Sequence, residues 1–140
     1  MKAELYLLQI QMIEQKIEDN IAEIQRLEAM ADNISPHLSE VKVSSTPNPH
    51  RAQEVWARLA DMQNELLDEI DGLVDLKKEV KQTLAKLPPS EYDVLHRIYV
   101  LRQPIQLIAR KTNYSRPTIY KIKVRGLEML QKILDSGERV

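Results

Sequence analysis

The sequence contains no cysteine and no phenylalanine, and only three of its 140 residues are glycine. Without cysteine the chain forms neither structural disulfides nor thiolate metal sites. Aromatic residues make up only 4% of the chain, which together with the scarcity of glycine argues against a sheet-rich fold. The chain also lacks a glycine-rich phosphate loop, a nucleophile motif and a dinucleotide fingerprint, and its histidines lack the spacing of a zinc site. We therefore expect an all-α protein that is not an enzyme and uses no cofactor or metal.

Long hydrophobic runs are absent as well. The N-terminal stretch MKAELYLLQIQMIEQ begins with a short apolar run that glutamine and glutamate interrupt. The run ends before it reaches the length of a signal-peptide core or of a bilayer span. We expect a soluble, cytoplasmic protein that makes no membrane contact.

Charge is balanced overall but divided along the chain. The net charge is −1, yet residues 1–87 carry 10 basic and 16 acidic residues, whereas residues 88–140 carry 10 basic and 5 acidic ones. An acidic part joined to a basic part indicates two tasks, with nucleic acid bound by the basic part. We therefore expect two domains, an arm over 1–87 and a C-terminal domain over 88–140.

The arm has the pattern of two long amphipathic helices, with apolar residues every three or four positions as in a coiled-coil seam. The first seam comprises Ile10, Ile13, Ile17, Ile21, Ile24, Leu27, Ala31 and Ile34, and the second, within 51–87, comprises Val55, Leu59, Met62, Leu66, Ile70, Leu73, Leu76, Val80 and Leu84. Residues 35–50 hold three prolines and four serines and are predicted to form a linker. Because neither helix buries its stripe alone, we expect a helical hairpin or coiled coil, packed within one chain or between chains of a homodimer.

Two features of the second helix are expected to be structural. Trp56 is expected to cap the packing between the helical arm and whatever docks beside it, since a single tryptophan at helical spacing more often packs in a core than binds a ligand. Asp68, Asp71 and Asp75 share one face, which we expect to be solvated or, alternatively, to contact a partner protein.

Three shorter helices are predicted in the C-terminal domain. Pro88 and Pro89 end the second long helix, and Ser90 is expected to cap a support helix near 91–101. The residues of that helix expected to face inward are Val94, Leu95, Ile98 and Leu101. A positioning helix is expected at 105–112 and a recognition helix from 116 to about 134. The last two have the features of a helix-turn-helix.

The turn between these two helices has suitable residues at each position. Asn113 tolerates a left-handed backbone, Ser115 is a good N-cap, and Pro117 lies where its missing N–H costs little. The residues expected to pack the helices together are Ile105, Ile108, Ala109, Tyr114, Ile119, Ile122, Gly126 and Leu127.

The outward face of this motif is basic. Residues 105–125 contain six basic residues and no acidic one, a pattern that attracts the phosphate backbone of DNA. Arg116 and Lys121 are predicted to donate to guanine, Pro117 and Thr118 to meet a thymine methyl group, and Tyr120 to face the groove beside them. The predicted phosphate contacts are Arg110, Lys111, Lys123 and Arg125.

The run IARKTNYSRPTIYKIKVRGLEML resembles the helix-turn-helix of bacterial sigma factor region four, and the whole chain resembles small phage transcriptional regulators of the RinA and ArpU type. By this resemblance Arg116, Tyr120 and Lys121 fall where the sigma family places groove contacts, and Ser115 falls at its helix cap. Pro117 and Thr118 replace an acidic and a basic residue that sigma factors usually carry, and the chain has no promoter-melting region. The resemblance therefore implies DNA binding in the same mode without the promoter specificity of sigma factors.

These features predict a phage or prophage transcriptional regulator that binds double-stranded DNA and contacts RNA polymerase in the bacterial cytoplasm. Regulators of the RinA and ArpU type are thought to activate late or packaging genes, so the resemblance implies an activator. Two alternatives stay open. A small terminase-like packaging subunit would form a ring, and a coiled-coil interaction protein or anti-sigma-like factor would act through the acidic arm. A purely structural three-helix bundle would bind DNA without specificity.

Overall fold

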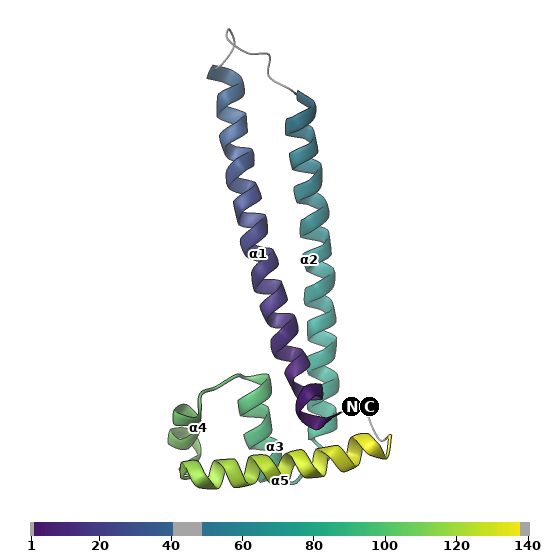
Figure 1. The fold of residues 1–140 in the computed structure, drawn as a ribbon, viewed down its shortest axis with the longest axis vertical. Coiled ribbons are helices and arrows are strands. Elements are labelled where there is room, and N and C mark those ends of the chain that lie inside the picture. Colours follow the sequence, from purple (N-terminus) through teal and green to yellow (C-terminus); the bar gives the residue numbers. More distant parts are fainter. Residues whose placement is uncertain (1, 41–48, 138–140) are drawn as a thin grey trace. The chain divides into compact units, whose positions relative to one another are not determined.

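The computed structural model describes residues 2–40 and 49–137, and every regular element within these ranges is a helix. Figure 1 shows the long helices α1 (Ala3–Glu40) and α2 (Pro49–Leu84) and the shorter helices α3 (Pro89–Leu95), α4 (Ile105–Thr112) and α5 (Arg116–Asp135). A single π-helical turn, η1 (His96–Val100), continues α3. The predicted all-α class is confirmed. Among the described helices, none is long and apolar enough to cross a membrane.

The segment predicted to be a linker, 35–50, differs most from expectation. α1 continues to Glu40 and α2 begins at Pro49, so both ends of this segment are helical. Pro36 lies within α1, where its missing N–H removes one hydrogen bond from a helix of 38 residues. Pro49 lies in the first turn of α2, a position that suits proline. Residues 41–48 of the predicted linker lie outside the described residues.

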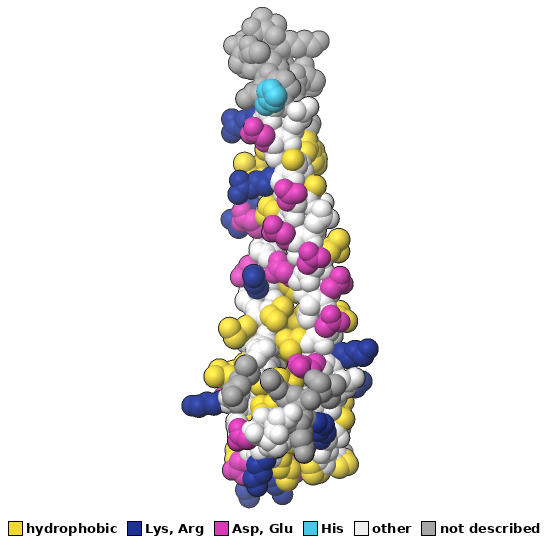
Figure 2. Space-filling view, turned by 90° about the vertical axis from the view of Figure 1, so that its right-hand side faces the viewer, with side chains coloured by type: hydrophobic (Ala, Val, Ile, Leu, Met, Phe, Trp, Pro, Cys, Tyr) yellow, Lys and Arg dark blue, Asp and Glu magenta, His cyan; other side chains and the backbone are white. Residues whose placement is uncertain are grey.

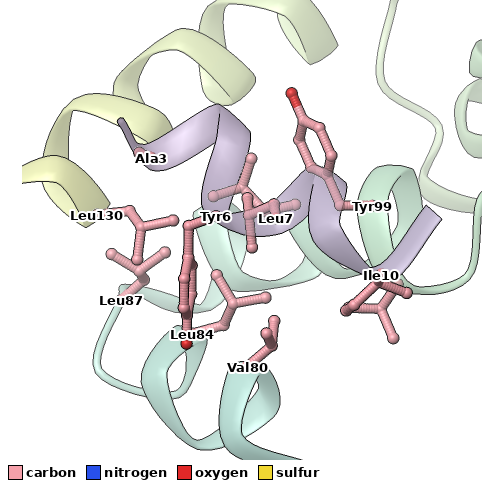
Figure 3. Close-up of a cluster of buried hydrophobic side chains, with 11 residues drawn as sticks. Ala3, Tyr6, Leu7, Ile10, Val80, Leu84, Leu87, Tyr99 and Leu130 are labelled. Carbon is pink, nitrogen blue, oxygen red and sulfur yellow. The ribbon is translucent and has the colours of Figure 1, made fainter. Parts of the chain in front are cut away.

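The chain divides into two compact units, residues 1–14 with 72–140 and residues 15–71. In the first unit, the start of α1 and the end of α2 share one apolar core with α3, η1 and α5, part of which Figure 3 shows. Its buried members are Ala3, Tyr6, Leu7, Ile10, Val80, Leu84, Leu87, Leu95, Tyr99, Val100 and Leu130. Because these helices share a core, the sequence boundary at residue 87 does not coincide with the boundary between compact units.

The π-helical turn changes which residues face this core. The backbone N–H of Leu101 donates to the carbonyl of His96 at 2.9 Å, five residues earlier. Tyr99 and Val100 are thereby buried, and Leu101 is 50% exposed. The prediction that Leu101 faces inward was wrong, because it assumed a regular α-helix through residue 101.

The start of α3 also differs from expectation. Pro88 holds the N-cap position without a side-chain hydrogen bond. The hydroxyl of Ser90 instead donates to Oε2 of Glu91 at 2.6 Å. Ser90 therefore does not cap α3, whereas Val94 and Leu95 are buried as predicted.

In the second unit, segments of α1 and α2 lie side by side and run in opposite directions (Figure 1). The amide of Asn20 donates to Oε1 of Glu69 at 2.7 Å between the two helices. The buried hydrophobic residues among the described side chains of this unit are only Ile17, Ile24, Ala31 and Leu59. Residues 15–71 carry 12 acidic and five basic residues, and Figure 2 shows acidic side chains spaced along the long helices. The second unit therefore has a small apolar core and a strongly acidic composition.

His96 makes the stability of the first unit depend on pH. Its ring stacks on Tyr92 with 5.5 Å between centroids, and burial, followed by the charge of Lys81, lowers the pKa of His96 below the usual 6.5, while Asp93 opposes this shift in part. The folded chain therefore binds the His96 proton less tightly than the unfolded chain does. Protonation destabilises the fold, and the loss sets in as pH falls through 6.5.

We expect the free energy of unfolding to fall more steeply below this pH in the wild type than in a His96→Gln variant, which cannot titrate. Urea unfolding curves at a series of pH values measure both. Parallel pH profiles for the two proteins would contradict the expectation.

Candidate nucleic-acid interface

A left-handed residue and a side-chain cap form the turn between α4 and α5. Asn113 has a φ of 62° and donates its backbone N–H to the carbonyl of Ala109 at 2.9 Å, which ends α4. Oγ of Ser115 accepts the backbone N–H of Thr118 at 3.3 Å and caps the start of α5. Both residues take the conformations expected from the sequence.

A small apolar core holds α5 on α4. Its buried members are Val94, Ile108, Ile119 and Ile122, with Ile98, Ile105, Ala109 and Tyr114 packed around them. Because one face of α5 packs against this core, the first turns of α5 present their other face to solvent.

The ten residues predicted to contact DNA lie at the end of α4, in the turn and along α5. Those that are exposed are Arg110, Lys111, Ser115, Arg116, Pro117, Tyr120, Lys121 and Arg125, whereas Thr118 and Lys123 are half-buried. Oγ1 of Thr118 lies 2.8 Å from Oγ of Ser115, so its hydroxyl takes part in the cap. Two of the ten residues, Lys123 and Arg125, have ion-pair partners inside the protein.

Lys123 connects α5 to the start of α1. Its Nζ lies 4.0 Å from Oε2 of Glu4 and 6.0 Å from the ring centroids of both Tyr99 and Tyr120. The hydroxyl of Tyr99 donates to the same Glu4 oxygen at 2.8 Å, and burial together with this carboxylate raises the pKa of Tyr99. The ammonium of Lys123 is thus surrounded by a carboxylate and two aromatic rings.

Arg125 neutralises a buried carboxylate. Its Nε lies 3.2 Å from Oε1 of Glu91, whose side chain is only 5% exposed. A buried charge without a partner is costly, so this pair holds α5 against α3. The helices α5 and α3 also approach each other closely at the next residue, because a Cβ added to Gly126 would lie 3.0 Å from Cδ1 of Leu95.

The six basic residues of 105–125 form what we call the basic block. The four of them other than Lys123 and Arg125 differ in their ion pairing. Arg110, Lys111, Arg116 and Lys121 take part in none of the ion pairs among the described side chains. Their charges lie at the end of α4 and in the first turns of α5, and all four are exposed. The basic residues of 105–125 therefore form two groups: four are exposed without an ion pair among the described side chains, and two are paired with carboxylates.

The acidic partners of Lys123 and Arg125 were not predicted from the sequence. Glu4 gave no signal, because α1 was assigned to a separate arm. Glu91 gave a detectable one: it lies three and four residues before Val94 and Leu95, on the inward face of the predicted support helix. A carboxylate on a buried face requires a cationic partner, and the block supplies it.

Comparison of the chain with protein-family models, with curated proteins and with solved structures finds no match. A functional assignment therefore depends on the residues and geometry described above.

Two glycine substitutions test the close approach of α5 to α3. Gly72→Ala, where nothing lies within 4 Å of the added Cβ, should raise the free energy of unfolding by about 0.5–1 kcal/mol because alanine favours the helix. Gly126→Ala should lose this gain, because crowding the buried Leu95 side chain costs about 1–3 kcal/mol. Urea denaturation followed by circular dichroism measures both. Equal stabilisation by the two substitutions would show that Leu95 yields without cost.

Removing the guanidinium of Arg125 should destabilise the fold. Arg125→Ala leaves Glu91 buried without its cation, and we expect a loss of about 1–3 kcal/mol in the free energy of unfolding. Lys121→Ala is the matched control, since it removes an exposed cation from the same helix and should change stability by less than about 0.5 kcal/mol. Chemical denaturation of both variants decides the point, and similar stability in the two would contradict a structural role for the pair.

Proposed function

We propose that this protein is a DNA-binding transcriptional regulator of the phage or prophage type. Its α4, turn and α5 act as a helix-turn-helix that inserts the start of α5 into the major groove of promoter DNA. Its long helices form a helical hairpin that mediates homodimerisation and contact with RNA polymerase. On the resemblance to regulators of the RinA and ArpU type, it activates late or packaging genes in the cytoplasm of a bacterial host.

One observation carries this proposal: the exposed cations Arg110, Lys111, Arg116 and Lys121 gather around a capped helix N-terminus and lack ion-pair partners among the described side chains. Cations that serve the fold acquire carboxylate partners, as Lys123 and Arg125 do. Cations left exposed and unpaired on one side of a domain attract phosphate.

We assign different tasks to these residues from their positions. Arg116 and Lys121 lie in the first turns of α5, where side chains reach base edges and donate to O6 and N7 of guanine. Pro117 and Thr118 offer apolar contact to a thymine methyl group, and Tyr120 presents an exposed ring beside them. Arg110 and Lys111, at the end of α4, contact phosphates and position the motif without reading sequence. Ser115 keeps the start of α5 in place.

Selection of bound duplexes from a random DNA library, with the intact protein at near-physiological salt, tests the proposal. We expect a defined motif, repeated as two half-sites if the protein binds as a dimer. Repeating the selection with Lys121→Ala should relax base preference at one position of the half-site, with a loss of about 1–3 kcal/mol in binding free energy. Recovery of no motif would refute a sequence-specific regulator.

The dependence of DNA affinity on salt concentration tests whether the exposed and the paired cations of the basic block contribute differently to phosphate binding. Arg110→Ala should lower the slope of log affinity against log salt by about 0.9, the contribution of one phosphate contact. Arg125→Ala serves as the control, because its guanidinium is held by Glu91, and should change the slope much less. Equal changes would show that Arg125 also clamps phosphate when DNA is bound.

The acidic charge of residues 15–71 favours a second candidate, a coiled-coil interaction protein or anti-sigma-like factor that acts through the arm. It predicts weak DNA binding that vanishes as salt rises and shows no sequence preference. The terminase-like alternative predicts a ring-shaped oligomer that has DNA affinity, which the mass of the assembly in solution would reveal.

A further inference from the structure

The first half of α2 has two stripes of residues that lie next to each other on the helix. The inner stripe is Val55, Leu59, Met62 and Leu66, all of which are buried or half-buried. The outer stripe is Trp56, Ala60, Gln63 and Leu67, all of which are exposed. Each outer residue directly follows an inner one, so both stripes keep the alternating spacing of four and three residues that is typical of a helix-packing seam.

The outer stripe exposes large apolar side chains. Trp56 is 46% exposed and Leu67 is 59% exposed, so a single chain covers Trp56 only in part, and the docked neighbour expected beside it stays a prediction. A helix that has two apolar faces normally packs against two neighbours. Here α1 supplies only one neighbour, and the second unit has few buried hydrophobic residues of its own. The outer stripe therefore has the composition of an interface, with a tryptophan near one end.

We propose that a second copy of this chain covers the outer stripe, so that two α2 helices pack against each other in a homodimer. A two-fold interface brings each patch against its own copy, so it must be complementary to itself. The outer stripe meets this requirement because it contains no charged side chain. Its one polar member, Gln63, both donates and accepts hydrogen bonds and can therefore pair with the Gln63 of a second copy.

The charges beside the stripe agree with this arrangement. The neighbouring positions on the side away from the inner stripe are Ala57 and Asn64, again without charge. The acidic residues Glu54, Asp61 and Asp68 lie further round the helix, and Asp71 lies one turn beyond Leu67, past the end of the stripe. In a homodimer they would stay at the edge of the contact, where solvent screens their repulsion. An acidic residue inside the stripe would instead have placed one carboxylate from each copy within the contact.

This inference deepens the proposed function, because it rests on that function for its purpose, namely placing two DNA-binding helices on two half-sites. The self-association itself is measured without DNA. Its failure is therefore distinguishable from failure of DNA binding, which the library selection reports.

Sedimentation equilibrium of the full chain over a wide range of protein concentration tests the inference. We expect a monomer–dimer equilibrium, accompanied by a shift of the fluorescence of Trp56, the only tryptophan, to shorter wavelength as the dimer forms. Leu67→Glu should weaken the dimer by about 10-fold or more and abolish the spectral shift, because it places one carboxylate from each copy inside the apolar contact. Gln63→Glu should do the same while changing the side-chain shape very little, and added salt should partly restore its dimer.

Met30→Glu is the matched control, because Met30 is 53% exposed on α1 in the same unit and lies outside the outer stripe. It should leave the dimer and the spectral shift unchanged, and circular dichroism should show equal helix content in all variants. A monomer at every concentration would overturn the inference. So would a dimer that survives both Leu67→Glu and Gln63→Glu, or one that Met30→Glu weakens equally. A partner protein that alone shifts the Trp56 emission of a monomeric chain would assign the stripe to that partner instead.

Discussion

The shared core of the first unit is the constraint on which the proposed DNA-binding surface depends. Tyr6 and Leu7 of α1 are almost fully buried with Leu84 and Leu130, residues from both ends of the chain (Figure 3). The hydroxyl of Tyr6 lies 3.2 Å from Oγ1 of the buried Thr83, so the polar group that enters this core has a partner there. The position of α5 is consequently set by α1 and α2 as well as by α3 and α4. The three C-terminal helices alone would lack most of this core.

Ion pairing divides the six basic residues of 105–125 into two groups. Glu91 and Glu4 come from different helices, and each pairs with a cation in the middle of α5. The unpaired positive charge of residues 105–125 is thereby confined to the end of α4 and the start of α5. The acidic residues of the second unit belong to a separate compact part of the chain. The chain therefore has a basic surface at the end of α4 and the start of α5 although its overall net charge is −1.

Local sequence patterns were sufficient to predict several helix limits and caps of this protein. The limits of α4 and α5, the left-handed Asn113 and the Ser115 cap all follow from short-range rules, and the structure has them where the sequence predicts them. What the sequence did not reveal is long-range: the pairing of Glu4 with Lys123 depends on a contact between the two ends of the chain. The π-helical turn also escaped prediction, because no spacing rule distinguishes it from an α-helix until the side chains pack. The extent to which Trp56 is exposed was not predicted either, because helical spacing alone does not show whether an apolar side chain is covered by its own chain or by a partner.

The composition of the first unit has a consequence for the order of folding. Its core joins residues 2–14 to residues 72–137, and the 57 residues between them belong to the other unit. During synthesis, the first turns of α1 leave the ribosome long before Leu130 is made, so they cannot reach their final environment until α5 is almost complete. Contacts this distant in sequence also close slowly. The acidic helical segments between them can pair earlier and, by bringing the two distant parts of the chain together, shorten the search that completes the basic surface.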